Sequence, residues 1–270
     1  MLFVLGCGYI GSRFLEQRPV SRADYIASTT SSSRVASLSC LAAEVVVIDG
    51  GDPNALEQSI DRVDILTIFI APAAGASYEE VYLRTAESIM PILQRRQKPL
   101  YVLYTSSTFV YQGCKGSLVS EESSLPLISL RAQLLFDTEN TYLACQNRWV
   151  SVCILRLAGI YGPGRDLLDR AGMLSGKRLP GTGLEPTNHI HQEDVVNAAW
   201  FCIDNHLTGV FNVASDSHPT RQELYHRLCT DLAIDPPLWD PTKTAEHGCG
   251  SVVCNHKIKQ AGFIFTYPTI

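Results

Sequence analysis

Short apolar runs alternate with longer amphipathic stretches through most of the chain. The apolar runs are nearly continuous and lack the alternation of polar and apolar residues that marks a half-exposed strand. Strands that are buried on both faces of a parallel sheet have this pattern. We therefore predict strands at Leu2–Leu5, Tyr25–Ser28, Glu44–Ile48, Ile65–Ile70, Leu100–Thr105, Val150–Leu155 and Val210–Val213.

The stretches between these strands show helical periodicity. Strand–helix alternation with connections of this length is typical of a doubly wound parallel sheet, so the predicted fold class is α/β. The expected helices are Ile10–Gln17, Arg34–Leu41, Pro53–Ile60, Tyr78–Gln97, Leu130–Gln146 and Glu193–Asn205.

The regular alternation of predicted strands and helices changes after Arg156. A glycine-rich segment follows, and a helix-like stretch from Pro219 leads into a proline-rich turn. We expect residues 1–164 to form the core. Residues 165–270 are expected to complete that core at about 188–215 and to form a small C-terminal lobe.

Composition narrows the class of protein. Hydrophobic residues make up 46% of the chain and charged residues 18%, which is typical of a globular protein. The net charge is −5 and the basic residues are scattered, so neither nucleic acid nor a membrane is an expected partner. No apolar run approaches the roughly 18 residues of a membrane span, and no basic region precedes Leu2 as in a signal peptide. Nine cysteines without paired spacings are typical of reduced thiols, so we expect a cytoplasmic protein.

A glycine motif joins the first predicted strand to the first predicted helix. Its sequence is Gly6-Cys7-Gly8-Tyr9-Ile10-Gly11. In such a loop Gly6 permits the tight turn, Gly8 lets a pyrophosphate approach the backbone, and Gly11 lets helix and strand pack closely. The free N–H groups and the dipole of the helix then favour the anion. The motif, Tyr9 and Ile10 included, predicts a dinucleotide-binding loop.

The residues at the end of the second predicted strand indicate which dinucleotide the loop would bind. A carboxylate that would accept hydrogen bonds from a ribose is absent there, and Thr29, Thr30 and Arg34 follow instead. Hydroxyls and a guanidinium suit a 2′-phosphate, so we predict NADP, with NAD as the alternative. A solvated surface charge is the other interpretation of Arg34.

Two further strand ends are expected beside this cofactor. Asp49 follows the third strand and would either meet the adenine edge or cap the next helix. Ala71 and Pro72 follow the fourth strand, where small residues would let the cofactor lie across the strand ends.

Several motifs occur in one order along the chain: Thr105–Tyr111, Leu155–Arg165, Asn188–Val195, Phe211–Asp216 and Asn255–Thr269. Together with the glycine loop they resemble the extended short-chain dehydrogenase/reductase superfamily, in its NAD-dependent epimerase/dehydratase group, and the ending resembles its atypical YeeZ-like branch. The resemblance implies a Rossmann-type core, a bound NAD(P) and a lobe for a small-molecule substrate such as a nucleotide sugar; it leaves a homodimer open.

The resemblance also implies catalytic residues. A serine that orients the substrate matches Ser107. Active members also use a tyrosine whose phenol, with a pKa of about 10, needs a lysine one helical turn later to work near neutral pH. Arg131 and Leu135 stand at the positions of that pair, which puts the usual proton transfer in doubt.

One Tyr-x-x-x-Lys does occur, at Tyr111 to Lys115. It is either a relocated catalytic pair or a coincidence in a loop, because Gly113 and Gly116 discourage a helix. If the protein has a proton donor, Tyr111 and Tyr161 are the candidates, with Arg131 as a fixed positive charge.

Three residues of the later motifs are substrate-binding candidates. Tyr161 lines the expected pocket, and Arg165 is either an anion binder or a surface charge. His191 would point the same way as His189 on a strand, and either contact with the substrate or a structural role fits the pair.

Soft metal ligands gather between His247 and His256. Alternation along a strand would send them to opposite faces, so no metal site is expected. Cys7 and Cys114 have no histidine at motif spacing, so neither is expected to act as a nucleophile. Two functions fit the sequence: an oxidoreductase or epimerase-like enzyme that uses NADP(H), or a cofactor-binding sensor or partner-binding module without turnover.

Overall fold

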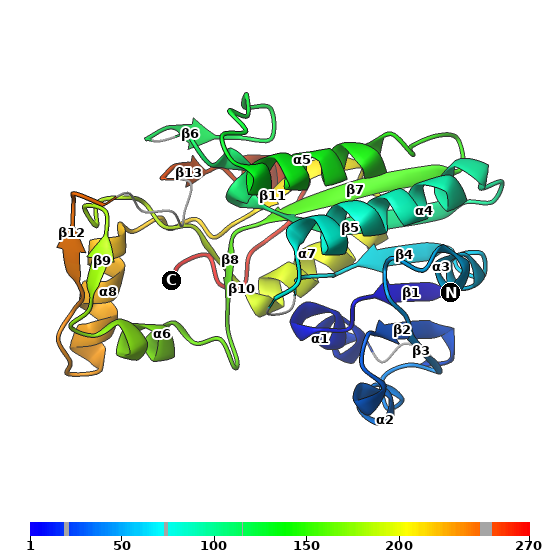
Figure 1. Cartoon of the computed structure of the whole chain (residues 1–270), viewed down its shortest axis with the longest axis horizontal. Helices are drawn as coiled ribbons and strands as arrows, with labels where there is room; N and C mark the ends of the chain where they lie inside the picture. The colour runs from blue at the N-terminus through cyan, green and yellow to red at the C-terminus, as the bar shows by residue number, and fades with distance from the viewer. Residues whose placement is uncertain (19–21, 73–74, 115, 244–249) are drawn as a thin grey trace. The chain divides into compact units, whose positions relative to one another are not determined.

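The structure is a computed structural model and describes residues 1–18, 22–72, 75–114, 116–243 and 250–270. Its largest element is a seven-stranded parallel sheet with strand order β11-β7-β5-β4-β1-β2-β3 (Figure 1). The order reverses between β1 and β4, which is the point where ligands bind in doubly wound folds. The strands are β1 (Leu2–Leu5), β2 (Tyr25–Thr29), β3 (Glu44–Val47), β4 (Ile65–Ile68), β5 (Leu100–Ser107), β7 (Val150–Leu157) and β11 (Gly209–Val213).

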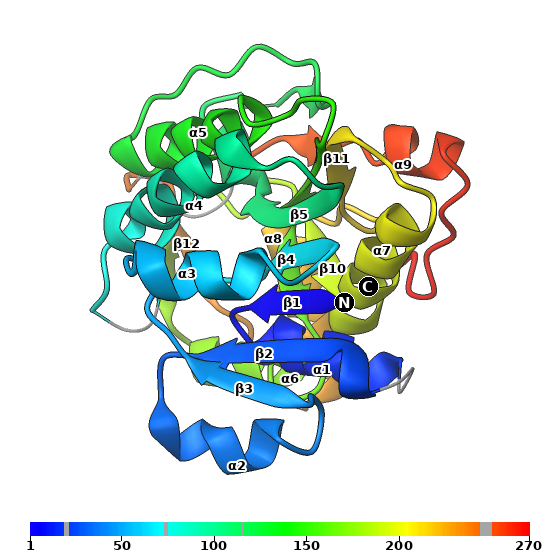
Figure 2. The same ribbon diagram turned by 90° about the vertical axis from the view of Figure 1, so that its right-hand side faces the viewer.

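Helices cover both faces of this sheet, which confirms the predicted fold class. In Figure 2, α3, α4 and α5 lie over one face, and α1 and α7 over the other. The helix expected at Arg34–Leu41 is shorter than predicted and begins as a 3₁₀ turn, Ser32–Arg34. The helices are α1 (Tyr9–Gln17), α2 (Val35–Leu38), α3 (Pro53–Ile60), α4 (Arg84–Arg95, preceded by a π turn at Glu79–Leu83), α5 (Leu130–Leu143) and α7 (Gln192–Asp204).

A buried ion pair ties α5 to β7. Arg156 donates from Nε to both carboxylate oxygens of Glu139 at 3.1 Å, and from Nη2 to Oε2 at 2.7 Å. The two side chains are 4% and 1% exposed. Burying one of these charges without the other would be very costly, and the hydrogen bonds between the two groups offset much of that cost.

The chain forms two compact units that are interleaved along the sequence. Unit 1 comprises residues 1–106, 133–156 and 196–210, and unit 2 comprises residues 107–132, 157–195 and 211–270. The boundary after residue 164 stays a prediction. No helix among the described residues is long and apolar enough to cross a membrane.

The described residues of unit 2 form three two-stranded sheets and a small helical core. Strand β8 (Gly159–Tyr161) pairs with β10 (His189–His191), β9 (Arg178–Pro180) with β12 (Leu238–Asp240), and β6 (Leu118–Val119) with β13 (Val252–Val253). Helix α6 (Leu167–Leu174) packs against α8 (Arg221–Asp231) around a cluster that includes Ala171 and Leu228, and α9 (His256–Gln260) lies near the C-terminus.

Candidate functional site

The three glycines of the loop in unit 1 have two different structural roles. Gly6 has a φ of +94°, and a Cβ there would lie 2.9 Å from the carbonyl carbon of Phe69. A Cβ on Gly11 would lie 2.4 Å from the carbonyl oxygen of Gly6. The protein's own packing therefore requires glycine at both positions.

Gly8 is different, because the protein leaves space around it. A Cβ on Gly8 would meet no atom within 4 Å, and its φ is −83°. Gly8 stands at the N-cap of α1, and no side chain caps the first N–H groups of the helix from this position. Backbone donors at a helix N-terminus, approached over a glycine, fit a phosphate group.

Arg34 lies against the same loop. Its Nη1 donates to the carbonyl oxygen of Cys7 at 2.5 Å, and its Nη2 to the hydroxyl of Ser12 at 3.2 Å. Thr29 is buried at the end of β2 and accepts from the N–H of Ser31, while Thr30 is exposed. The fold thus brings a guanidinium to the mouth of the glycine loop, and β2, which ends at Thr29, pairs with β1.

The other residues predicted at the cofactor also lie in unit 1. Asp49 is exposed and accepts from the N–H of Gly51 at 3.0 Å; the cap of α3 is Asp52 instead. Ala71 and Pro72 follow β4, the strand beside β1. Burial raises the pKa of the Cys7 thiol to about 12, which keeps it neutral and unreactive.

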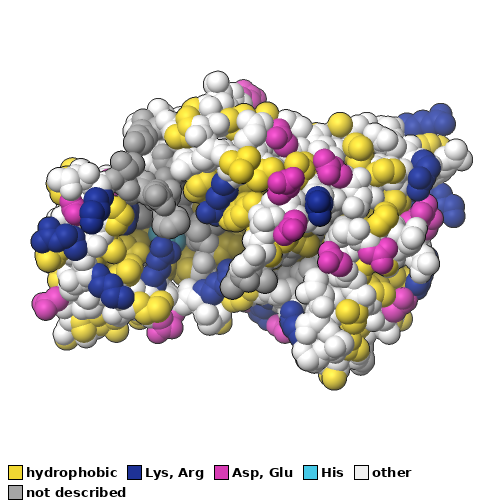
Figure 3. Space-filling model, viewed as in Figure 1, with side chains coloured by type: hydrophobic (Ala, Val, Ile, Leu, Met, Phe, Trp, Pro, Cys, Tyr) yellow, Lys and Arg dark blue, Asp and Glu magenta, His cyan; other side chains and the backbone are white. Residues whose placement is uncertain are grey.

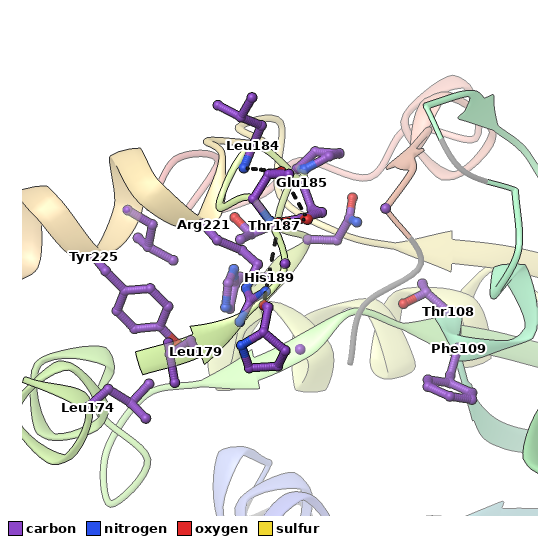
Figure 4. Close-up of a pocket in the computed structure, with 18 of the residues that line it drawn as sticks. Thr108, Phe109, Leu174, Leu179, Leu184, Glu185, Thr187, His189, Arg221 and Tyr225 are labelled. Atoms are coloured by element: carbon purple, nitrogen blue, oxygen red, sulfur yellow. Dashed lines mark hydrogen bonds and ion pairs between the residues drawn. The ribbon is translucent and has the colours of Figure 1, made fainter. Parts of the chain in front are cut away.

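A second site is a cavity of about 900 Å³ whose described lining lies wholly in unit 2. One wall is apolar, with Leu174 and Tyr225 (Figure 4). Ser107 and Thr108 lie at another wall. Ser107 ends β5, and its hydroxyl accepts from the N–H of Phe109 at 3.2 Å, which caps the 3₁₀ turn Thr108–Tyr111.

The charged side chains among the described cavity lining are mainly cationic. Arg131 is the second residue of α5, and its guanidinium lies 4.1 Å from the ring centre of Phe109. Glu185 is the one carboxylate among the described lining residues, and Thr182 donates to it from N–H and hydroxyl. In Figure 3 basic side chains gather over the face that carries α6, α8 and β12. The basic lining residues are Arg131, Arg170, Arg221 and Lys243.

Tyr111 is not among the described residues that line this cavity. It is fully buried, and its hydroxyl donates to Oδ1 of Asn212 at 2.8 Å. Asn212 in turn donates from its N–H to Glu121 at 2.7 Å. Lys115, the other half of the Tyr-x-x-x-Lys, lies outside the described residues.

His189 lines the cavity, whereas the three residues that the sequence predicted to bind substrate are placed differently. Tyr161, Arg165 and His191 are not among its described lining residues. His191 packs between Tyr161 and Tyr267, with ring centres 5.2 and 3.7 Å apart. Burial lowers the pKa of His191 and raises that of Tyr161.

Several cavity residues had no signal in the sequence. Arg170, Arg221, Lys243 and Tyr225 come from α6, α8 and the segment after β12, and no motif spacing relates them. His189 did carry a signal, because it belongs to the motif before α7.

No group of three or more metal-ligating side chains occurs within the described ranges. His247 and Cys249 of the predicted cluster fall in the gap between residues 243 and 250.

The strand order and the covering helices define a doubly wound α/β protein of the Rossmann type. The chain belongs to the NAD dependent epimerase/dehydratase family, whose model matches residues 2–214. Protein YeeZ of Escherichia coli K12 is 27% identical over 225 residues, which are 83% of this chain and 77% of that protein.

Solved structures have the same fold at low identity. An NAD complex of dTDP-glucose 4,6-dehydratase from Bacillus anthracis has a TM-score of 0.80 and 19% identity, and covers 98% of this chain and 91% of its own. UDP-glucose 4-epimerase from Thermotoga maritima, solved with UDP-glucose, has a TM-score of 0.75 and 18% identity, with 96% and 91% covered.

Proposed function

We propose that the chain binds a nicotinamide dinucleotide at the loop Gly6–Gly11. The open space at Gly8, where the N-terminus of α1 has no side-chain cap, is the observation that carries this proposal. The pyrophosphate would accept from the N–H groups at the N-terminus of α1, and Ala71 and Pro72 would border the cofactor at the end of β4. Membership of the family supports the same assignment.

NADP is the cofactor we propose, in preference to NAD. Arg34 lies at the loop, fixed by Cys7 and Ser12, and Thr29 and Thr30 add hydroxyls at the end of β2. A guanidinium binds a 2′-phosphate with charge-assisted hydrogen bonds, whereas no carboxylate stands there to accept from a free ribose.

The reaction we propose is an oxidoreductase or epimerase-like conversion of a sugar nucleotide or a related carbonyl or hydroxyl compound. The nicotinamide, when bound, supplies or accepts hydride. Ser107 would orient the substrate oxygen, and Arg131 would hold a fixed positive charge beside it; both line the cavity of unit 2. Its basic lining would take the substrate's anionic part, and two structural neighbours of the chain are named for nucleotide sugars, dTDP-glucose and UDP-glucose.

A second function has a specific observation in its favour. By the family resemblance, Arg131 and Leu135 stand where active members carry tyrosine and lysine, and Leu135 is fully buried. Tyr111 is committed to Asn212. A cofactor-binding sensor or partner-binding module without turnover is therefore the alternative.

The cofactor proposal is tested by titrating the purified chain with NADPH and NADH and following the fluorescence of the reduced nicotinamide. Gly8→Ala is the decisive variant. Its methyl group meets no protein atom, so the variant should fold normally, yet it occupies the space assigned to the pyrophosphate and should abolish binding. Gln58→Ala, at an exposed position of α3, is the control and should bind like the wild type.

If neither nucleotide binds the wild-type chain, or if Gly8→Ala binds as well as the wild type, the cofactor assignment is wrong. The two functions are separated by incubating the NADP-loaded chain with UDP-glucose, dTDP-glucose and simple aldehydes and ketones. Product formation or a change in nicotinamide absorbance that Ser107→Ala abolishes supports the enzyme. Cofactor binding without turnover of any of these compounds supports the sensor.

A further inference from the structure

His189 lies among the side chains that line the cavity of unit 2. Its ring stands between Leu174 and Tyr225 on one side and Thr108 and Phe109 on the other (Figure 4). The residue is 9% exposed, and its Nδ1 is buried without a hydrogen-bond partner among the described residues. A polar side chain so deeply buried is expected to have a partner, yet no described residue hydrogen-bonds to this ring, so the partner is expected to be a ligand at the ring edge that borders the cavity.

Gly159 leaves space beside the other edge of this ring. Strands β8 and β10 pair in parallel with His189 opposite Gly159. A Cβ on Gly159 would lie 3.4 Å from Cδ2 and 3.8 Å from Nε2 of His189, and 3.2 Å from the carbonyl oxygen of Asn188. The backbone of Gly159 is not in the left-handed region, so its conformation does not demand glycine. The absence of a side chain on Gly159 instead leaves room beside Nε2 of His189, and Gly159 itself lines the cavity.

The charge state of His189 decides what this edge can offer. Burial, and then the positive charge of Arg170, lower the pKa of His189 to about 4, so the imidazole is neutral at pH 7. A neutral imidazole carries one N–H and one lone pair. An N–H at the buried Nδ1 would reach no acceptor, whereas an N–H at Nε2 can reach water or a ligand in the cavity. The favoured tautomer therefore has its proton on Nε2.

The groups around this donor indicate what would accept from it. Arg170 lines the same cavity and lies close enough to His189 to lower its pKa. Lys243 and Arg131 add positive charge. The one carboxylate of the described lining, Glu185, accepts from Thr182 at Oε1, and its Oε2 lies 3.7 Å from Nη1 of Arg221. An anionic oxygen fits this environment, because it accepts a hydrogen bond and neutralises the cations.

We propose that His189 is a ligand-contact residue whose Nε2–H donates to a phosphate oxygen of the ligand, beside Arg170, in space that Gly159 leaves free. The proposal rests on the proposed function only for the sugar-nucleotide part of the ligand. The phosphate contact itself is independent of that part.

Substitutions at the two positions test the contact by calorimetric titration of the full chain with UDP-glucose and with pyrophosphate. The amide nitrogen of glutamine can stand near Nε2 of a histidine, and that of asparagine near Nδ1. We expect His189→Gln to keep most of the affinity, and His189→Asn and His189→Phe to lose about tenfold or more, since the hydrogen bond goes to a charged group. Gly159→Ala should also weaken binding, while Gly172→Ala, whose methyl meets nothing within 4 Å, should not.

Nitrogen NMR of the ¹⁵N-histidine-labelled chain reads the contact directly, with the His189→Gln variant assigning the resonance among seven histidines. We expect a neutral ring protonated on Nε2, with an Nε2 resonance that shifts when either probe binds. A proton on Nδ1, a resonance that neither bound probe moves, equal affinities of the Gln and Asn variants, or failure of both probes to bind would each overturn the inference. Binding of pyrophosphate without UDP-glucose, with the Nε2 shift, would instead remove the sugar-nucleotide substrate and leave the phosphate contact intact.

Discussion

The guanidinium of Arg34 donates to the carbonyl oxygen of Cys7, 27 residues earlier in the chain, and so lies at the mouth of the glycine loop. Sequence alone could not separate this arrangement from a solvated surface charge. The contact fixes a cation where the proposed 2′-phosphate would bind, and it leads to the first prediction.

Arg34→Ala should lower the affinity for NADPH by about tenfold to a hundredfold and leave that for NADH nearly unchanged, because charge-assisted hydrogen bonds to the 2′-phosphate are lost. Fluorescence titration with both nucleotides measures the effect. Arg95→Ala removes the same charge from an exposed ion pair on α4 and should change neither affinity. Equal losses for NADPH and NADH would argue against discrimination by Arg34.

Gly11→Ala should destabilise the protein by about 1–3 kcal/mol, because its methyl would lie 2.4 Å from the carbonyl oxygen of Gly6 and force the loop and α1 apart. Gly172→Ala in α6 is the matched helical glycine with free space, and it should be neutral or stabilising by up to about 1 kcal/mol. Urea denaturation of both variants gives the comparison. A Gly11 variant as stable as the wild type would show that the loop relaxes without cost.

Glu139→Gln should cost about 3–5 kcal/mol of unfolding free energy, because it leaves the buried charge of Arg156 without its counter-ion. The exposed pair between Glu57 and Arg95 is the control, and Glu57→Gln should cost no more than about 1 kcal/mol. Equal effects of the two substitutions, measured by denaturant unfolding, would contradict the assigned role of the buried pair.

Tyr111→Phe removes a buried hydroxyl and leaves Oδ1 of Asn212 without this donor, so we expect a loss of about 1–3 kcal/mol in stability. Cofactor binding and any turnover should persist in the folded variant. A variant of normal stability that loses turnover would instead make Tyr111 the proton donor that the sequence allowed.

The stability of the wild type should fall as the pH drops from about 6.5 towards 4. In this range the unfolded chain protonates His189, whose pKa is about 6.5 there, while burial and Arg170 hold the folded-state pKa at about 4. The contribution to the slope is at most about 1.4 kcal/mol per pH unit. His189→Gln should flatten the curve in this window when unfolding is followed at a series of pH values, and an unchanged slope would exclude His189 as its source.

The sequence by itself determined the sheet, its covering helices and the glycine loop. These features are local, because burial on both faces makes a strand continuously apolar and a tight turn before a helix requires glycine at set spacings. Predicted strand ends such as that of β1 therefore agree with the structure, while α2 and the π turn before α4 depend on packing that periodicity does not report.

Only the tertiary structure decided which side chains share the cavity of unit 2. Arg170, Arg221 and His189 come from separate elements, and their meeting depends on how those elements pack. The same is true of Tyr111: its match to a family motif gave no hint that its hydroxyl would donate to Asn212, about a hundred residues later. Local sequence encodes backbone conformation and burial, but the partners of a polar side chain come from distant parts of the chain and are fixed only when the whole chain folds.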